Sequence, residues 1–293
     1  MSALTPTNLK LGIDPAPYTT QTVTVAGLRL SIKDFGSPGK PEMLCVHGGA
    51  ANSHWFDFVA TGFCNDFHVR AIDLRGHGDS QWDPAADPDY SYERYAADIH
   101  ELTELLDIKD FVLVGHSMGG IVSSVYAGTY PGRANTFILV DSTLNLSPER
   151  IAGFNAVGSR EGRHYATEAE FIAHYKVRPG GSTATPAVLS HIAQHSGRLF
   201  EDGRWRYKFD RKVYANRKRV EIFPHWNHIT IPALLVKGDR SGRITPETIA
   251  EVKARSPRVS VTEISNSEHH VTLDNPIEFV QTISEFIHKN KSL

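Results

Sequence analysis

Short apolar runs alternate with longer stretches of helical periodicity through most of the chain. The runs are rich in Val, Leu, Ile and Phe, and the first four lie at 43–46, 69–72, 111–114 and 137–140. Their alternation with helical stretches predicts parallel strands joined by helical crossovers. Two β-prone runs within 23–35 flank Ala26-Gly27. They predict an antiparallel hairpin at the edge of the sheet.

The helical periodicity is strongest over residues 92–108. Tyr, Ala, Ile and Leu recur there at steps of three and four, which places them on one helix face. Strand and helix patterns resume later in the chain, with strands predicted at 233–237 and 259–264 and helices at 246–254 and 276–288. The expected fold class is therefore α/β, with a mostly parallel sheet.

Residues 142–231, here called the inserted segment, separate two core strands and have helical and loop character without strong strand alternation. We therefore expect a core made of 21–141 and 232–293. Ligands bind in open α/β sheets at the carboxyl ends of the strands, so a segment that leaves from that edge would roof the pocket. Residues 1–20 are rich in Pro and Thr and predict an extended N-terminal arm.

The composition of the chain limits the kinds of partner that we expect. With 293 residues, 40% of them hydrophobic, the chain can build one large core plus an insertion. Its net charge of -2 gives no electrostatic reason to expect a nucleic acid or a membrane surface as partner. The N-terminus lacks the apolar stretch of a secretory signal, and we expect a cytoplasmic protein. The two cysteines, Cys45 and Cys64, are expected to be buried thiols without a disulfide.

Ser117 carries the strongest chemical signal. It stands in the sequence GHSMGG (115–120), directly after a predicted strand and at the start of a helical stretch. Glycines on both sides allow a serine to occupy a sharp strand-to-helix turn with its hydroxyl exposed for attack. The predicted role of Ser117 is that of a nucleophile.

Three further motifs accompany this turn: VHGG at 46–49, DLRGHGDS at 73–80, and His269 followed by LDNP at 273–276. With the four motifs in this order, the chain resembles the α/β-hydrolase superfamily over most of its length. The resemblance implies an eight-stranded, mostly parallel sheet with helices on both faces. It also implies that the inserted segment is a helical lid, and that no cofactor is needed.

The resemblance further implies that His269 is the general base, because it lies seven residues before Pro276. The resemblance leaves the acid open. The usual position for it is occupied by Ser241. Two candidates stay open: Asp239, and Asp141 at the end of the strand at 137–140, as in some lipases of the superfamily. The chemistry needs a carboxylate within hydrogen-bond reach of the imidazole, and we prefer Asp141.

An oxyanion hole is expected from the backbone N–H groups of Met118 and Gly49, with Ala50 as the alternative to Gly49. His47, Ala50 and His116 are the candidate residues of a substrate pocket. For His47, a role in stabilising its loop is the simpler expectation.

No metal site is predicted. His191 and His195 would share one helix face, but no acidic third ligand lies near them in sequence, and a buried or exposed histidine pair is the preferred interpretation. Residues 198–219 are basic, with aromatic residues interleaved. That stretch could attract a carboxylate-bearing or aromatic substrate, although a solvated surface is the simpler interpretation.

The predicted function is a serine hydrolase that cleaves a carboxylic ester or a related acyl bond of a small molecule through an acyl-enzyme. Two alternatives stay open. One is hydrolysis of a carbon-carbon bond, as the resemblance to meta-cleavage hydrolases with a similar G-x-S-M-G-G turn implies. The other is a ligand-binding protein of this fold with little or no turnover, which the absence of an acid at Ser241 favours.

Overall fold

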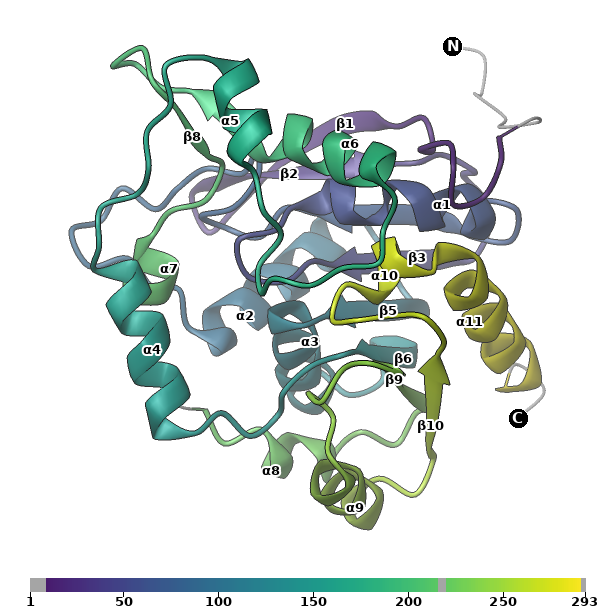
Figure 1. Ribbon diagram of the computed structural model, residues 1–293. Coiled ribbons are helices and arrows are strands. Elements are labelled where there is room, and N and C mark those ends of the chain that lie inside the picture. The colour runs from purple at the N-terminus through teal and green to yellow at the C-terminus, as the bar shows by residue number, and fades with distance from the viewer. Residues whose placement is uncertain (1–8, 216–219, 291–293) are drawn as a thin grey trace.

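The computed structural model describes residues 9–215 and 220–290. Eight strands of this part of the chain form one sheet in the order β1-β2-β4-β3-β5-β6-β9-β10 (Figure 1). β2 is antiparallel to both of its neighbours, and the other pairs are parallel, which confirms a mostly parallel sheet. The strands are β1 (Thr19–Val25), β2 (Leu28–Asp34), β3 (Glu42–Val46), β4 (His68–Ile72), β5 (Phe111–His116), β6 (Ala134–Val140), β9 (Ala233–Gly238) and β10 (Val259–Ile264).

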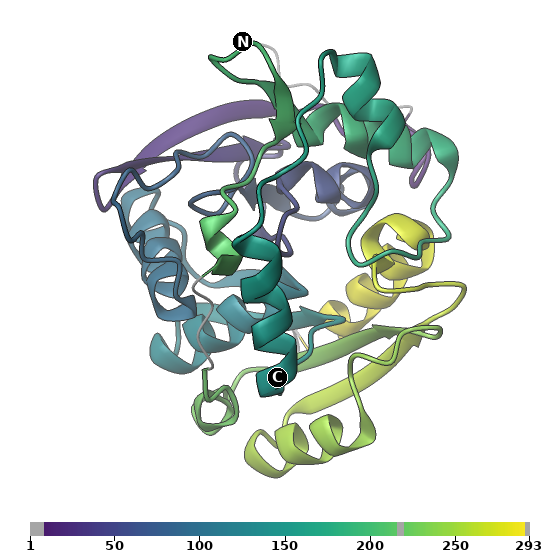
Figure 2. The ribbon, with the colours of Figure 1, turned by 60° about the vertical axis from the view of Figure 1, so that its left-hand side comes forward.

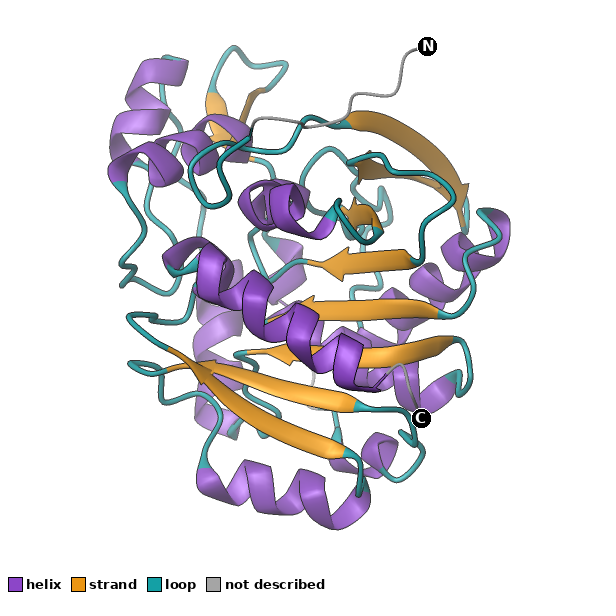
Figure 3. Ribbon diagram, turned by 90° about the vertical axis from the view of Figure 1, so that its right-hand side faces the viewer, coloured by secondary structure: helices purple, strands orange, loops and turns teal. Residues whose placement is uncertain are grey.

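Helices cover both faces of the sheet, as Figure 3 shows for α11 on the near face. One core lies under α1 and α11, and the other under α2, α3, α8 and α9. Two short helices, η1 and α10, also belong to the core. The core helices are η1 (Ser53–Phe56), α1 (Asp57–Phe63), α2 (Tyr92–Leu105), α3 (Met118–Thr129), α8 (Phe223–Trp226), α9 (Pro246–Arg255), α10 (Val271–Asp274) and α11 (Pro276–Asn290).

β3 shows why the central strands are continuous apolar runs. Leu44 and Val46 belong to the core under α2 and α3, whereas Met43 and Cys45 belong to the core under α1 and α11. Successive side chains of a strand point to opposite faces, so a strand covered on both faces needs apolar residues at every position. Cys45 of this strand and Cys64, which follows α1, are both buried free thiols, as predicted.

The hairpin of β1 and β2 turns at the predicted dipeptide. Ala26 and Gly27 have φ angles of 48° and 77°, and the register pairs Val25 with Leu28. Positive φ at both central residues defines the type I′ turn, whose twist matches that of the flanking strands.

The helix predicted at 92–108 ends earlier, at Leu105. Asp107 has a φ of 51°, and the N–H of Ile108 bonds the carbonyl of Thr103 instead of continuing the helical pattern. Leu105 is 57% exposed, so it lies outside the buried face on which the periodicity placed it. The apolar spacing continues past the helix because Ile108 is buried from the following loop.

The inserted segment lies between β6 and β9 (Figures 1 and 2). α4 packs against α7, and α6 contacts η1 of the core. A two-stranded antiparallel sheet of β7 and β8 was not expected, because three-residue strands are too short for an alternation to be recognised. The role of the inserted segment as a lid stays a prediction. The elements of the segment are α4 (Pro148–Gly158), α5 (Glu168–His174), α6 (Pro186–Ser196), β7 (Gly197–Leu199), β8 (Trp205–Tyr207) and α7 (Lys212–Ala215).

Part of the predicted N-terminal arm lies outside the described residues, namely 1–8. In the described part, Ala16 is buried and its N–H bonds the carbonyl of Asp57, while Thr19 already belongs to β1. None of the helices in the described part of the chain is long and apolar enough to cross a membrane.

Candidate active site

Ser117 sits between the last residue of β5 and the first residue of α3, with φ 54° and ψ -117°. A residue with a side chain adopts such a conformation only where its surroundings enforce it. A Cβ at Gly115 would lie 2.5 Å from the Ser123 hydroxyl oxygen, and one at Gly119 would press on the backbone carbonyl of Val46. The glycines of the motif therefore allow the close packing that holds Ser117 in this turn.

Ser117, His269 and Asp141 form a hydrogen-bonded chain. The hydroxyl of Ser117 is 2.9 Å from Nε2 of His269, and Nδ1 of His269 is 2.6 Å from Oδ2 of Asp141. A carboxylate can only accept, so Nδ1–H donates to Asp141 and Nε2 is left to accept the Ser117 proton. The arrangement can activate a serine hydroxyl by general base catalysis.

Asp141 follows β6 directly and is fully buried. Its φ is 44°, and its N–H bonds the carbonyl of Val236 on β9. Burial raises the pKa of this carboxyl to about 6, and a hydrogen bond from the Ser241 hydroxyl, 2.7 Å from Oδ2, opposes the rise. The serine at the usual acid position thus supports an acid on the neighbouring strand.

Asp239, the other candidate acid, is engaged elsewhere. Its carboxylate oxygens accept the backbone N–H groups of Asn266 and Ser267, at 3.0 and 2.8 Å. These contacts hold the loop that leads to His269, and among the hydrogen bonds of the described residues none joins Asp239 to that imidazole. Of the two acids that the sequence left open, the geometry brings Asp141 to His269.

The surroundings of His269 favour its neutral form. Burial lowers the pKa of the imidazole well below its ordinary value, and the positive charges of Arg243 and Arg150 lower it further, together with His270. A neutral imidazole can accept a proton, so these neighbours keep His269 in the form that general base catalysis would require.

Ser117 opens into a cavity of about 600 Å³, which Gly49 and Met118 also line. Met118 is the first residue of α3, and the N–H groups of a first helical turn point out of the helix end. A Cβ at Gly49 would lie 2.5 Å from the phenolic oxygen of Tyr214. The two residues of the predicted oxyanion hole therefore lie beside Ser117. Their role as donors stays a prediction.

None of the three pocket candidates, His47, Ala50 and His116, is among the described residues that line this cavity. His47 is fully buried, donates from Nδ1 to the carbonyl of the next residue at 2.7 Å and accepts the N–H of Leu74 at 3.1 Å. His116 is buried and its Nε2 donates to the carbonyl of His269 at 2.9 Å. Ala50 borders a small neighbouring hollow. Both histidines hold the loops of the site in place, and substrate contact by the three residues stays a prediction.

Three arginines that sequence reasoning missed also line the cavity. Arg150 comes from α4, Arg178 from the loop after α5, and Arg243 from the loop after β9. Within the described parts of the chain they take part in no ion pair, and one carboxylate, Glu149, lines the same cavity. The sequence around each of them contains no motif that distinguishes it from a surface arginine. The three come together only through the path that the inserted segment takes over the core.

The basic stretch at 198–219 contributes little to the lining of this cavity. Of its described residues, Tyr214 lines the cavity. Residues 216–219 lie outside the described part of the chain. The cationic character of the site comes from other positions than the sequence suggested.

Comparison with known proteins agrees with the observed fold. The sequence model of the alpha/beta hydrolase family matches residues 43–282. A 2-(acetamidomethylene)succinate hydrolase from Mesorhizobium japonicum is 26% identical, over 92% of this chain and 95% of that protein. A 3-hydroxybutyrate-oligomer hydrolase from Cupriavidus necator is 27% identical, over 88% of this chain and 93% of that protein.

A solved structure of an E-2-(acetamidomethylene)succinate hydrolase superimposes with a TM-score of 0.81 and 24% identity. The superposition covers 93% of this chain and all of that one. This likeness shows that the two chains share a fold.

Proposed function

The chain belongs to the alpha/beta hydrolase family, and we propose that it is a serine hydrolase that cleaves an acyl bond in a small, carboxylate-bearing substrate. The observation that carries the proposal is the hydrogen-bonded chain from Ser117 through His269 to Asp141 beside a cavity of about 600 Å³. A cavity of that size suits a small molecule. A carboxylic ester is the first choice of substrate.

In this mechanism the Ser117 oxygen attacks the carbonyl carbon while its proton moves to Nε2 of His269. The N–H groups of Gly49 and Met118 stabilise the oxyanion. Collapse expels the alcohol, which takes the proton from His269 and leaves an ester on Ser117. A water molecule then gives a proton to His269 and attacks the acyl group, and Ser117 departs with that proton. Asp141 orients the imidazole and stabilises its charged form.

The substrate class rests on Arg150, Arg178 and Arg243. Guanidinium groups stay charged at every physiological pH and match carboxylates in geometry. Without ion-pair partners among the described residues, the three are available to a substrate anion in the same cavity as Ser117. A carboxylate there would reduce the repulsion between the arginines and align the acyl group with the nucleophile.

The named substrates of the two relatives are consistent with this class. The Mesorhizobium japonicum enzyme is named for a succinate derivative, which is a dicarboxylate. The Cupriavidus necator enzyme is named for oligomers of a hydroxy acid, which are esters with a terminal carboxylate. Both names support an anionic substrate for this chain.

A matched pair of esters tests the proposal: p-nitrophenyl butyrate and p-nitrophenyl hemisuccinate, which are similar in length and differ in a terminal carboxylate. We expect kcat/KM to be at least about tenfold higher for the hemisuccinate, because a charged hydrogen bond contributes about 1.5–3 kcal/mol. The preference should shrink in Arg243→Gln. Equal or better hydrolysis of the butyrate would exclude the anionic class, and turnover of neither ester would contradict the esterase function.

Two alternatives use the same site. Hydrolysis of a carbon-carbon bond would need the same three side chains, and analysis of the products distinguishes it from ester cleavage. The absence of an acid at Ser241 would favour a ligand-binding protein only if no other carboxylate reached His269. Asp141 is within hydrogen-bond reach of His269, so this reason does not apply.

A further inference from the structure

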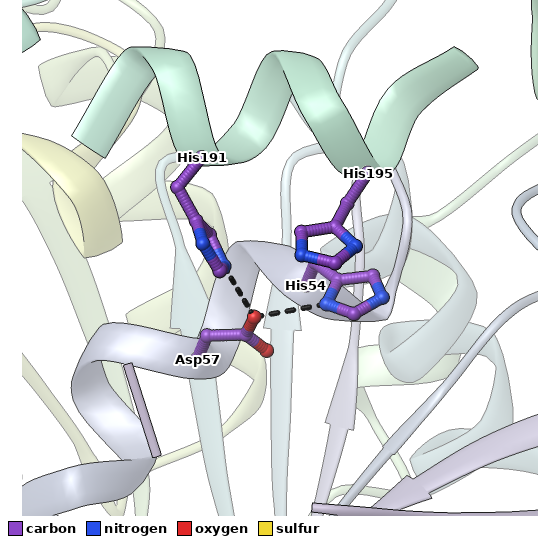
Figure 4. A group of neighbouring side chains, drawn as sticks. All are labelled: His54, Asp57, His191 and His195. Atoms are coloured by element: carbon purple, nitrogen blue, oxygen red, sulfur yellow. Dashed lines mark hydrogen bonds and ion pairs between the residues drawn. The ribbon is translucent and has the colours of Figure 1, made fainter. Parts of the chain in front are cut away.

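Three histidines and an aspartate gather between the inserted segment and the core, away from Ser117 in the sequence and on other elements. Figure 4 shows His191 and His195 pointing down from α6 toward His54 of η1 and Asp57 of α1. Oδ2 of Asp57 is 2.9 Å from Nδ1 of His54 and 2.7 Å from Nε2 of His191. His195 stacks on His54, with ring centroids 3.8 Å apart. One carboxylate oxygen therefore serves two imidazoles, and a third imidazole lies against them.

Asp57 has incomplete hydrogen bonding for a buried carboxylate. It is fully buried, its ion-pair partners within the described residues are the two histidines, and its Oδ1 has no hydrogen-bond partner there. A buried carboxylate is unfavourable unless positive charge or several donors compensate it. The two histidines each donate one N–H to Oδ2, so Oδ1 keeps a lone pair that a bound cation could use.

His195 is suited to bind one. Its ring lies against both other imidazoles, with centroids 3.8 Å from that of His54 and 4.6 Å from that of His191. Within the described residues its ring takes part in no hydrogen bond, which leaves the ring nitrogens available. Phe58 packs edge-on against His191 and Tyr18 against His54, which shields the group from water.

We propose that His54, Asp57, His191 and His195 form a binding site for a divalent transition metal ion, with Zn²⁺ as the best match. Their ligand atoms all lie within 4.8 Å of one another. A tetrahedral zinc site with bonds of about 2.0–2.1 Å separates its ligands by about 3.4 Å. The ion would lengthen the two short contacts to Asp57 and draw His195 inward, so side-chain rotation is enough to complete the site.

Binding requires a change of tautomer but no other reaction. In the hydrogen-bonded arrangement, Nδ1 of His54 and Nε2 of His191 carry the protons that Asp57 accepts. With the ion present, each proton lies on the other ring nitrogen, and the freed lone pairs and the Asp57 oxygen contact the metal. The sequence predicted no metal here because Asp57 lies 134 positions before His191, and only the fold brings them together.

The ion would join α6 of the inserted segment to η1 and α1 of the core. Its role is structural, because no residue of the group lines the cavity beside Ser117. The other histidine cluster, His116, His269 and His270, belongs to the candidate active site and is not a second metal site. Both ring nitrogens of His269 are already engaged there.

The test is zinc binding to the whole protein after treatment with a chelator. Zn²⁺ is titrated against a chromophoric competitor, Co²⁺ is added separately to read its absorption spectrum, and Tm is measured with and without Zn²⁺. We expect one equivalent of Zn²⁺, a Co²⁺ spectrum typical of tetrahedral coordination, and a Tm increase of about 5 °C or more when free Zn²⁺ exceeds Kd about a hundredfold.

His195→Ala is the sharpest variant, because it leaves both hydrogen bonds to Asp57 intact. Its Tm without metal should stay close to that of the parent protein, whereas its zinc affinity should fall at least about tenfold. His288→Ala, an exposed histidine on α11, is the matched control and should bind as the parent does. The proposal is overturned if the parent protein binds no zinc above a chelator blank, or if His195→Ala and His191→Ala bind it as tightly as His288→Ala.

Discussion

The hydroxyl of Ser241 donates a hydrogen bond to Oδ2 of Asp141, the same oxygen that accepts Nδ1–H of His269. The two contacts measure 2.7 and 2.6 Å, and Asp141 is fully buried. Two donors on one oxygen stabilise the ionised carboxylate against the effect of burial. The loop after β9, where Ser241 stands, thus supports a carboxylate that the neighbouring strand β6 supplies.

The two candidate acids should behave differently on substitution. In the proposed mechanism, Asp141→Asn removes the group that orients His269, and kcat/KM for an activated ester should fall by about 10³ to 10⁴. Asp239→Asn should lower it by less than about tenfold, because Asp239 holds a loop instead. Steady-state kinetics with Tm as the folding control decides the matter. The reverse order of effects would assign the acid to Asp239.

Ser241 offers a test of the shared oxygen. Ser241→Ala removes a hydrogen bond to a charged group, worth about 1.5–3 kcal/mol, and should lower kcat/KM by about ten to a hundredfold. The loss of that donor also raises the pKa of Asp141, so activity should decline at a higher pH as the solution is acidified. Moving the carboxylate in Asp141→Asn/Ser241→Asp should recover part of the activity lost in Asp141→Asn. No effect of Ser241→Ala would show that the contact has no catalytic consequence.

Arg243 should set the acid limb of the pH profile. Its positive charge lowers the pKa of His269, and it also lowers the pKa of Asp141. Removing the charge lets both groups take up a proton at higher pH, which inactivates the base and the acid. The acid limb of kcat/KM for a neutral ester should therefore move to higher pH in Arg243→Gln.

Two controls accompany this measurement. Arg243→Lys keeps the charge and should leave the limb near its original position. Arg240→Gln changes an exposed residue of the same loop and should have no effect. A limb that stays in place or moves to lower pH in Arg243→Gln would contradict the electrostatic account of His269.

Gly49 tests the predicted oxyanion hole. Its Cβ in Gly49→Ala would lie 2.5 Å from the Tyr214 phenolic oxygen, so the loop or the tyrosine must move. If the loop moves, the Gly49 N–H leaves its place and kcat/KM should fall by about 10² or more. Tyr214→Phe removes the colliding oxygen and should restore part of the activity in the double variant.

The matched control for Gly49 is Gly153→Ala. Gly153 lines the same cavity, and no atom lies within 4 Å of a Cβ placed there. In the helix α4 this substitution should leave kcat/KM nearly unchanged and stabilise the fold slightly. Equal effects of the two substitutions would mean that the loss comes from filling the cavity.

The sequence predicted the sheet well because β3, β5 and β6 are covered on both faces and therefore contain little but apolar residues. Ser117 and His269 could be predicted as partners because each lies within a local motif. The acid was not settled, since the choice between Asp141 and Asp239 depends on which loop meets His269 in space.

The inserted segment accounts for most of what could not be predicted. Its helices carry Arg150, His191 and His195, yet no periodicity in its sequence fixes how it folds back over the core. The arginines that line the cavity and the histidines around Asp57 each combine residues from both parts of the chain. Such groupings depend on long-range packing, which single-sequence patterns do not contain.

In the proposed mechanism, Ser117 is a nucleophile activated by His269 and Asp141. The most direct test is reaction with a fluorophosphonate, followed by intact-mass analysis and peptide mapping. We expect one adduct per chain, located on Ser117, with labelling abolished in Ser117→Ala and His269→Ala and much slower in Asp141→Asn than in Asp239→Asn. If the parent protein acquires no adduct, or acquires it on another residue, Ser117 is not the nucleophile.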